Sequence, residues 1–170
     1  MRILGIDPGS NATGYGVVSV EGSTLRRLGG GTIRTRGESL GERLAHLQRE
    51  LERAIAELAP EAAALESVFS AKNARSALVL GHARGVALAA CAIAGLATDE
   101  YTPSQVKVAV TGYGRAEKLQ VMKMVQRLLG LAAPPPSDEA DALAVAVCHG
   151  LSRRSPARLA LQALAAERPA

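Results

Sequence analysis

Aromatic residues are scarce in this chain of 170 residues, at 2% of the sequence, and Trp is absent. Hydrophobic residues nevertheless make up 48%, so the core has to be aliphatic. The length is sufficient for one domain that buries roughly two-thirds of its unfolded surface. Such a core does not need aromatic side chains, so each of the four is a candidate for another role. They are Tyr15, Phe69, Tyr101 and Tyr113.

Cysteine and long apolar runs are also scarce. Cys91 and Cys148 lie in apolar surroundings without a second metal ligand nearby in sequence, which favours buried thiols in a reducing compartment over a disulfide or a metal site. The longest apolar run, Val86–Leu96, has 11 residues, whereas a bilayer requires about 20. A signal peptide has a basic region followed by an apolar one, and the residues before Asp7 do not show this pattern. We therefore expect a cytoplasmic protein without a membrane partner.

The charge balance is basic, with 20 Lys and Arg against 16 Asp and Glu, a net charge of +4 and a pI near 9.4. This excess suits a polyanionic partner, although an Arg-rich surface can also serve solubility alone. The sequence shows no internal repeat and no second domain. We expect one domain over residues 1–150 and a basic C-terminal tail over 151–170, either a weak helix or disordered.

Periodicity and turn residues predict three strands, a helix, a strand, a helix, a strand and then helices. The expected strands cover 2–7, 13–20, 24–35, 61–68 and 98–101, and the expected helices cover 39–59, 73–96, 102–112, 115–129 and the segment from 137. The first three strands form an antiparallel meander, in which Gly29-Gly30-Gly31 predicts a bulge or bend. The Ala-rich run 61–68 is ambiguous by propensity, but its place between two long helices favours a buried parallel strand.

Helix boundaries carry clear signals. Ser39 with Glu42 and Thr102 with Gln105 each form a capping box, and Ser137 is expected to cap the last helix.

The helix over 73–96 has an unusual stripe of small residues at Gly81, Gly85 and Ala89. Each Gly costs about 1 kcal/mol of helix propensity. The stripe therefore predicts a close neighbour, either the sheet or a second subunit.

Carboxylates occur where elements end or begin. Asp7 ends the first strand and is followed by Pro8-Gly9-Ser10, Glu66 closes the fourth, and Asp138 and Asp141 share one face of the last helix. Each has a plainer explanation: a tight turn at Asp7, a surface edge at Glu66, and a favourable helix dipole for the pair.

Together, however, the four acids can meet at one edge of a sheet. Oxygen ligands without His or Cys suit Mg²⁺ or Mn²⁺, and clustered carboxylates would repel one another without cations. Two ions about 4 Å apart can hydrolyse phosphodiesters in line. The sequence thus indicates a two-metal site with Mg²⁺, or Mn²⁺, as cofactor.

Residues suited to nucleic acid lie near these acids. Phe69 follows Glu66 in a polar, basic loop, where an aromatic ring can stack on an unpaired base, although single aromatics usually pack in a core. Lys107, Arg115 and Lys118 precede the last acidic pair. Such side chains are most often only solvated, but three near one site would hold a phosphate backbone.

At this point the sequence resembles the RuvC family of Holliday-junction resolvases. The resemblance covers the chain to about His149. The matching segments, in order, are Gly5-Ile6-Asp7-Pro8-Gly9-Ser10, Thr13-Gly14-Tyr15-Gly16, Glu66, Val68-Phe69, Ala71-Lys72-Asn73, Ser76-Ala77-Leu78, Leu80-Gly81, Ala83-Arg84-Gly85-Val86-Ala87, Gln105-Val106-Lys107, Ala116-Glu117-Lys118 and Ala140-Asp141-Ala142-Leu143-Ala144.

The resemblance implies an α/β fold of the RNase H-like type, a mixed five-stranded sheet with three antiparallel strands first and helices on both faces. It also implies a homodimeric endonuclease of DNA recombination and repair that nicks two opposing strands of a four-way junction. Its partners would be junction DNA and a branch-migration complex of a junction-binding protein and a ring ATPase.

By the same resemblance, the metal ligands fall on Asp7, Glu66, Asp138 and Asp141, with two ions, and the catalytic lysines on Lys107 and Lys118. The DNA-binding residues would be Phe69, Lys72, Asn73, Arg75, Lys107, Arg115 and Lys118. The dimer interface would contain Gly81, Gly85 and Ala89.

Two other functional classes share features with this sequence. A non-catalytic junction-binding protein on this fold would gain nothing from four acids facing DNA. An actin-like ATPase can open with a motif like that around Asp7, but it needs a second domain for which 170 residues leave no room.

Overall fold

The computed structural model describes residues 1–9, 11–67 and 74–153, and the side chain of Arg75 is not among them. The predicted DNA-loop residues Phe69, Lys72 and Asn73, and nearly all of the predicted tail, lie outside the described residues. The elements are β1 Arg2–Asp7, β2 Ala12–Glu21, β3 Thr24–Arg34, α1 Leu40–Leu58, β4 Ala62–Glu66, α2 Ala74–Ile93, β5 Thr98–Tyr101, α3 Pro103–Thr111, α4 Lys118–Leu128 and α5 Ser137–Ser152.

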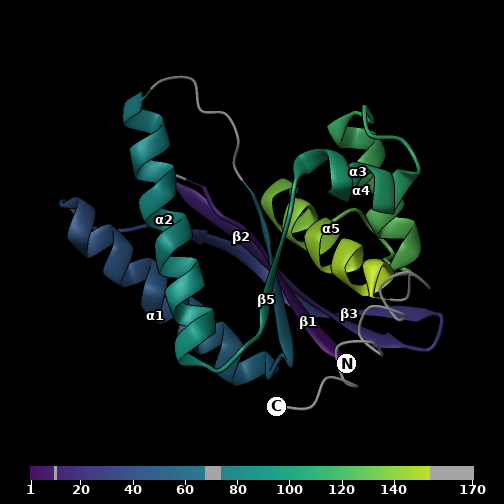
Figure 1. The fold of residues 1–170 in the computed structure, drawn as a ribbon, viewed down its shortest axis with the longest axis horizontal. Helices are drawn as coiled ribbons and strands as arrows, with labels where there is room; N and C mark the ends of the chain where they lie inside the picture. The colour runs from purple at the N-terminus through teal and green to yellow at the C-terminus, as the bar shows by residue number, and fades with distance from the viewer. Residues whose placement is uncertain (10, 68–73, 154–170) are drawn as a thin grey trace, which may run out of the picture.

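The strands form one mixed five-stranded sheet in the order β3-β2-β1-β4-β5 (Figure 1). β1, β2 and β3 pair antiparallel, whereas β4 pairs parallel with both β1 and β5. The predicted α/β fold with three antiparallel strands first is therefore confirmed. The Ala-rich β4 is buried from Ala62 to Leu65, as expected for a central parallel strand.

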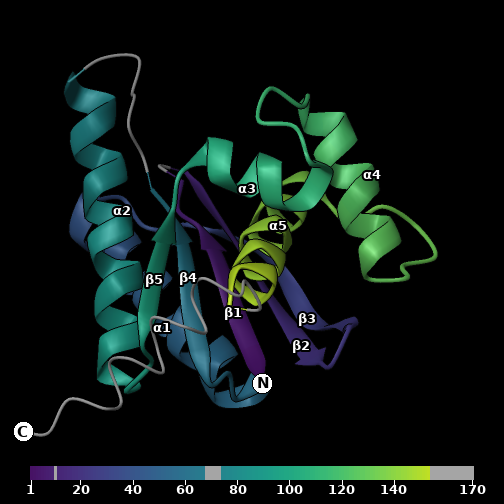
Figure 2. The same ribbon diagram turned by 45° about the vertical axis from the view of Figure 1, so that its right-hand side comes forward.

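Helices cover both faces of the sheet (Figure 2). Alternate residues of β1 point to opposite sides, so Ile3 packs in the core beneath α5 while Leu4 packs with side chains of α1 and α2. α3 and α4 pack on the outer side of α5. Cys91 and Cys148 lie buried in the two cores, and burial raises the pKa of each thiol to about 11.

The central helix α5 lies unusually close to the sheet, because glycines on the strands leave room for its backbone. A Cβ added to Gly5 of β1 would overlap the carbonyl oxygen of Ala142, and one added to Gly14 of β2 would overlap that of Asp138. A Cβ on Gly16 would come within 2.6 Å of the Leu143 side chain. The first turn of α5 is thereby held against the sheet.

Local sequence signals mostly predicted the structure correctly. Both capping boxes are present, at Ser39 and at Thr102. The pairing of β2 with β3 shifts register where Val17 faces Gly29 and Val18 faces Arg27, so the predicted irregularity occurs at the start of the triple glycine.

Two expectations about helix starts are wrong. Ser137 does not cap α5, because the helix already includes it and Pro136 occupies the N-cap without a side-chain bond. The helix expected from residue 115 begins at Lys118, after Glu117 as N-cap.

The small-residue stripe of α2 faces away from the sheet. Gly81, Gly85 and Ala89 are exposed, and a Cβ on either glycine would meet no atom within 4 Å. Leu78 and Ile93 are 66% and 74% exposed on the same helix. In the described part of the chain, α2 alone, over Ser76–Ile93, is long and apolar enough to span a membrane by length and composition. Of this segment 22% is buried, and one side of α2 packs in the core through Ala83 and Ala87.

Candidate active site

The topology brings the four predicted acids to one end of the sheet. Asp7 ends β1 and Glu66 ends the neighbouring parallel strand β4, with Ile6 paired to Leu65 just before them. On the β2 side of β1, Asp7 pairs with Gly14, and the backbone of Asp138 packs against Gly14. One helical turn later, Asp141 follows on the same face of α5.

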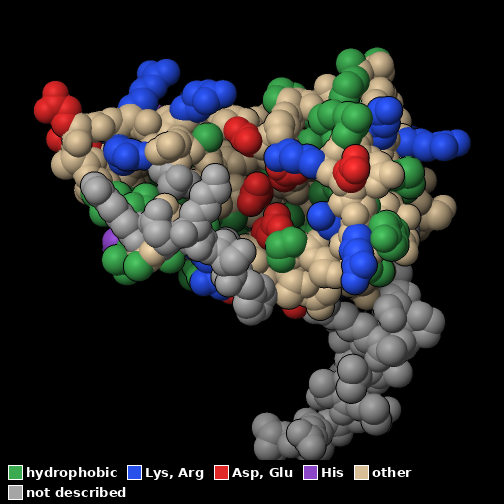
Figure 3. Space-filling view, turned by 90° about the horizontal axis from the view of Figure 1, so that it is seen from above, with side chains coloured by type: hydrophobic (Ala, Val, Ile, Leu, Met, Phe, Trp, Pro, Cys, Tyr) green, Lys and Arg blue, Asp and Glu red, His purple; other side chains and the backbone are tan. Residues whose placement is uncertain are grey.

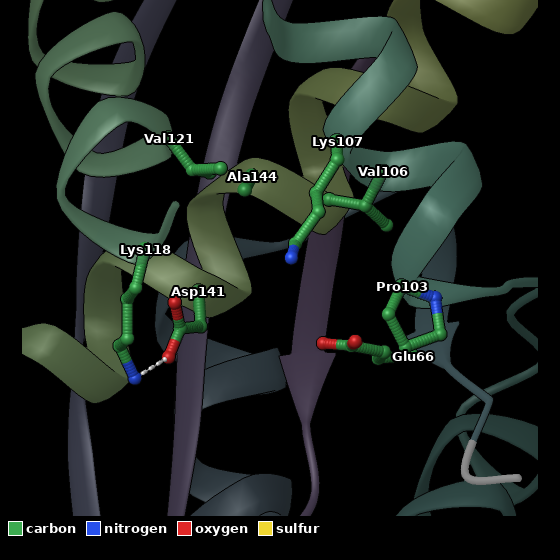
Figure 4. A pocket seen from close by; sticks show the side chains of 8 residues that line it. All are labelled: Glu66, Pro103, Val106, Lys107, Lys118, Val121, Asp141 and Ala144. Carbon is green, nitrogen blue, oxygen red and sulfur yellow. Dashed lines mark hydrogen bonds and ion pairs between the residues drawn. The ribbon is translucent and has the colours of Figure 1, made fainter. Parts of the chain in front are cut away.

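A pocket of about 230 Å³ opens at this end of the sheet. Glu66 and Asp141 lie on opposite sides of it, and Lys107 of α3 and Lys118 of α4 reach in from the outer helices (Figure 4). Lys118 forms an ion pair with Asp141. The apolar part of the wall consists of Pro103, Val106, Val121 and Ala144.

Burial and the repulsion of neighbouring carboxylates make ionisation of Asp7 unfavourable. The pKa of Asp7 is raised from 3.8 to about 7, first by burial and then by Glu66, Asp141 and Asp138, while Lys118 acts in the opposite direction. A carboxyl group with this pKa is only partly ionised at neutral pH, because the positive charge of Lys118 does not offset its burial and the neighbouring acids.

The same causes act on two other acids. Burial and then the charge of Asp141 raise the pKa of Glu66, against the opposing effect of Lys107 and Lys118. Burial also raises the pKa of Asp141, although its hydrogen bond from Lys118 lowers it. Two lysines therefore only partly compensate the carboxylates.

The donor set fits a hard divalent cation, since all four candidate ligands are carboxylates. In the part of the chain that the structure describes, no group of three or more Asp, Glu, His or Cys side chains is arranged to hold a metal ion by itself. Mg²⁺ does not require one, because it usually keeps several waters and binds one or two carboxylates together with substrate phosphates. Glu66 and Asp141 both line the pocket and are carboxylates available to an ion bound in that way (Figure 4).

The surface around the acids is basic. Figure 3 views the molecule from above relative to Figure 1, and shows acidic side chains gathered in a hollow with Lys and Arg around them. Arg115 is exposed in the turn between α3 and α4 but does not line the pocket. Arg75 lies in the first turn of α2, with only its backbone described.

Sequence reasoning missed one ionic group beside the site. Glu139, between the two acids of α5, is 4% exposed and accepts a hydrogen bond from Nε of Arg27 at 2.6 Å. The only sequence signal was a third acid in the first turn, and its partner on β3 is 112 residues away.

The electrostatics of Asp7 predict a pH-dependent stability. Because its folded pKa of about 7 exceeds its ordinary value of 3.8, its contribution to stability is fully present below about pH 4 and is lost as the pH rises through 7. Asp7→Asn should therefore raise the free energy of unfolding at pH 8 in EDTA, on the order of 3 kcal/mol, and the gain should vanish near pH 4. Urea unfolding at both pH values measures this, and a loss of stability at pH 8 would contradict it.

Comparisons with known proteins agree with this geometry. The family described as Crossover junction endodeoxyribonuclease RuvC matches residues 3–149. A relative of that name from Shewanella amazonensis is 52% identical over 147 residues, which cover 86% of this chain and 85% of the relative.

Solved structures extend the similarity to the fold. A structure of Thermus thermophilus RuvC has a TM-score of 0.83 at 38% identity, covering 91% of this chain and 96% of that one. A T. thermophilus RuvC structure in complex with a Holliday junction substrate also has a TM-score of 0.83, at 35% identity, covering 92% and 97%. The fold predicted as RNase H-like is thus shared along nearly the whole chain. This chain belongs to the RuvC family of crossover junction endodeoxyribonucleases.

Proposed function

We propose that this chain resolves four-way DNA junctions by metal-dependent hydrolysis of two opposing strands. The observation that carries the proposal is the meeting of Asp7, Glu66, Asp138 and Asp141 at one end of the sheet. This site lies in a chain that shares its fold with an RuvC bound to a Holliday junction. The enzyme would act in DNA recombination and repair, and we place it in the cytoplasm.

Asp7, Glu66, Asp138 and Asp141 are the side chains that would hold two ions, Mg²⁺ or Mn²⁺. When bound, such ions supply an activated water and stabilise the charge that develops on the phosphate. The residues of the chain do the remaining work. Asp7 and Glu66 are fixed on adjacent strands, so their carboxylates approach a phosphate from a rigid base. The raised pKa of Asp7 reflects a site arranged for cations.

The two lysines complete the phosphate environment. Lys118 neutralises Asp141 and thereby reduces repulsion between the site and DNA. Lys107 lines the pocket and lowers the pKa of Glu66, so its ammonium is close enough to affect that carboxylate. Both are suited to contact the phosphate under attack. Outside the pocket, Arg115, Arg75, Lys72 and Asn73 would contact flanking phosphates, and Phe69 would stack on a base at the branch point.

The exposed stripe on α2 is proposed as the dimer interface. Gly81 and Gly85 present bare backbone, and Leu78 leaves apolar surface exposed on the same helix. Because no described part of this chain occupies that space, a second copy is the neighbour that the glycines accommodate. A two-fold dimer would match the symmetry of a four-way junction. A branch-migration complex of a junction-binding protein and a ring ATPase would deliver the junction.

The first prediction tests catalysis. Asp7→Asn should reduce junction cleavage ~10³-fold or more, equivalent to ~4 kcal/mol, because it removes the carboxylate at the centre of the cluster. Binding of the junction in EDTA should change less than threefold. Gel assays with a labelled four-way junction measure both, with Glu52→Gln, an exposed acid on α1, as the control. Cleavage by Asp7→Asn at the wild-type rate would refute the proposed mechanism. If the variant lost junction binding as well as cleavage, Asp7 would be needed for binding the junction and not for catalysis alone.

The second prediction tests phosphate contact by Lys107. Each phosphate contact contributes about 0.9 to the slope of log affinity against log salt. Lys107→Ala should thus weaken junction binding and reduce that slope by about one. Lys123→Ala is the matched control, because Lys123 is exposed on α4 and does not line the pocket. Equal slopes for wild type and Lys107→Ala would show that this side chain does not contact a phosphate.

The third prediction tests the dimer. Gly85→Arg should convert the protein to a monomer in sedimentation velocity, because the new side chain blocks close approach of a second helix. The single chain should keep its stability, since a Cβ there meets nothing within 4 Å. Gly41→Arg, at an exposed glycine of α1, is the control and should leave the association state unchanged. A Gly85→Arg protein that sediments like the wild type would exclude this face.

A further inference from the structure

The first turn of α5 carries Asp138, yet it lacks a side-chain cap. Its N-cap is Pro136, which makes no side-chain capping bond. Without such a cap, the first N–H groups of a helix have no side-chain partner and the turn frays readily. Besides the packing of the Asp138 backbone on Gly14, a side-chain contact with β3 helps to keep this turn in place.

Glu139 and Arg27 form the contact that does so. The side chain of Glu139 is 6% exposed, and that of Arg27, on the edge strand β3, is 33% exposed. Nε of Arg27 donates to Oε1 of Glu139 at 2.6 Å, and a second nitrogen of the guanidinium donates to the carbonyl of Gly30 at 3.4 Å. The arginine thus connects the first turn of α5 to the backbone of β3.

The strand is shaped to receive this carboxylate. A Cβ on Gly30 would be 3.0 Å from Oε1 of Glu139 and 2.8 Å from the carbonyl oxygen of Tyr15. A larger residue at this position would therefore push Glu139 out of its place. Glycine at position 30 lets Glu139 lie against the strand.

The other two acids of the turn point elsewhere. Residues 138 and 141 share a helical face, whereas Glu139 is rotated from Asp138 by one residue toward β3. Glu139 also lines a separate cavity of about 250 Å³ with Arg27 and the Pro135-Pro136 segment, and it does not line the pocket between Glu66 and Asp141. Its carboxylate is satisfied by arginine and is not directed at the metal site.

We propose that the Arg27–Glu139 ion pair is a positioning clamp that holds Asp138 and Asp141 at the distance from Asp7 at which the site binds divalent cations. Glu139 and Arg27 are positioning residues, not ligands. The inference rests on the proposed metal-dependent function. It predicts that breaking the clamp weakens cation binding even in the absence of DNA.

The test is calorimetric titration of MnCl₂ into the full-length chain without DNA, for wild type, Glu139→Gln, Arg27→Met and the double variant. We expect each single change to weaken Mn²⁺ binding at least tenfold. Because the two residues act as one unit, the Mn²⁺ affinity of the double variant should be no lower than that of whichever single variant binds Mn²⁺ more weakly. Glu50→Gln, which breaks the 2.5 Å pair with Arg53 on α1, is the control and should bind Mn²⁺ as the wild type does.

Cleavage provides a second measurement. The variants should need at least tenfold more Mn²⁺ for half-maximal cleavage, while their junction affinity in EDTA stays within twofold of wild type. Arg27→Lys keeps the positive charge but lacks the guanidinium Nε–H donor, so it should show an intermediate loss of Mn²⁺ affinity. It also serves as the test if Glu139→Gln fails to fold. Titrations are run at a temperature where circular dichroism shows each variant folded.

Three results would overturn the clamp: unchanged Mn²⁺ isotherms in folded variants, losses that multiply in the double variant, or tighter binding by Arg27→Met. The last would mean that Glu139 is a ligand restrained by arginine. No Mn²⁺ uptake by the wild type would overturn the proposed function and the clamp with it, whereas unchanged uptake by the variants alone would overturn only the clamp.

Discussion

The close approach of α5 to the sheet is the constraint on which the site depends. At Gly5 and Gly14 the helix backbone occupies the space that a side chain would fill, so Asp138 lies directly beside the strand residue paired with Asp7. A helix kept farther from the sheet by intervening side chains would carry its acids away from β1 and β4. The glycines in these strands thus serve helix packing first, and the cluster of carboxylates follows from it.

Holding the acids together has an energetic cost that the rest of the site offsets only in part. Burial and repulsion raise the pKa of Asp7 to about 7, and Lys118 opposes this. An arrangement that is unfavourable without cations becomes favourable when they bind, because metal affinity and folding stability are linked. The same physics explains why a non-catalytic DNA-binding protein would have little reason to keep four such acids.

Local signals allowed much of this structure to be predicted from sequence. The capping boxes at Ser39 and Thr102 depend on residues three apart, and the acids that end β1 and β4 could be placed at one edge from strand order alone. The family resemblance, carried by motifs such as that around Asp7, was confirmed by the comparisons. The roles of individual site residues remain predictions.

Long-range contacts set the limit of that reasoning. Nothing near Glu139 in sequence indicates that Arg27 is its partner, and nothing near Gly14 indicates that it receives the backbone of α5. Ser137 was misassigned because a good capping residue directly followed Pro136, which takes the N-cap position itself. The stripe at Gly81 and Gly85 predicted either the sheet or a second subunit as neighbour; the structure excludes the sheet, and the second subunit stays a prediction.

The most direct test of the account is to map the cuts that the wild-type protein makes in a four-way junction with each strand labelled in turn. A linear duplex of the same sequence serves as the control, with Mg²⁺ present or chelated. The account predicts paired nicks at symmetric positions in two opposing strands, dependent on Mg²⁺, with the linear duplex intact. Cutting that persists in EDTA, or that occurs equally in the linear duplex, would contradict it.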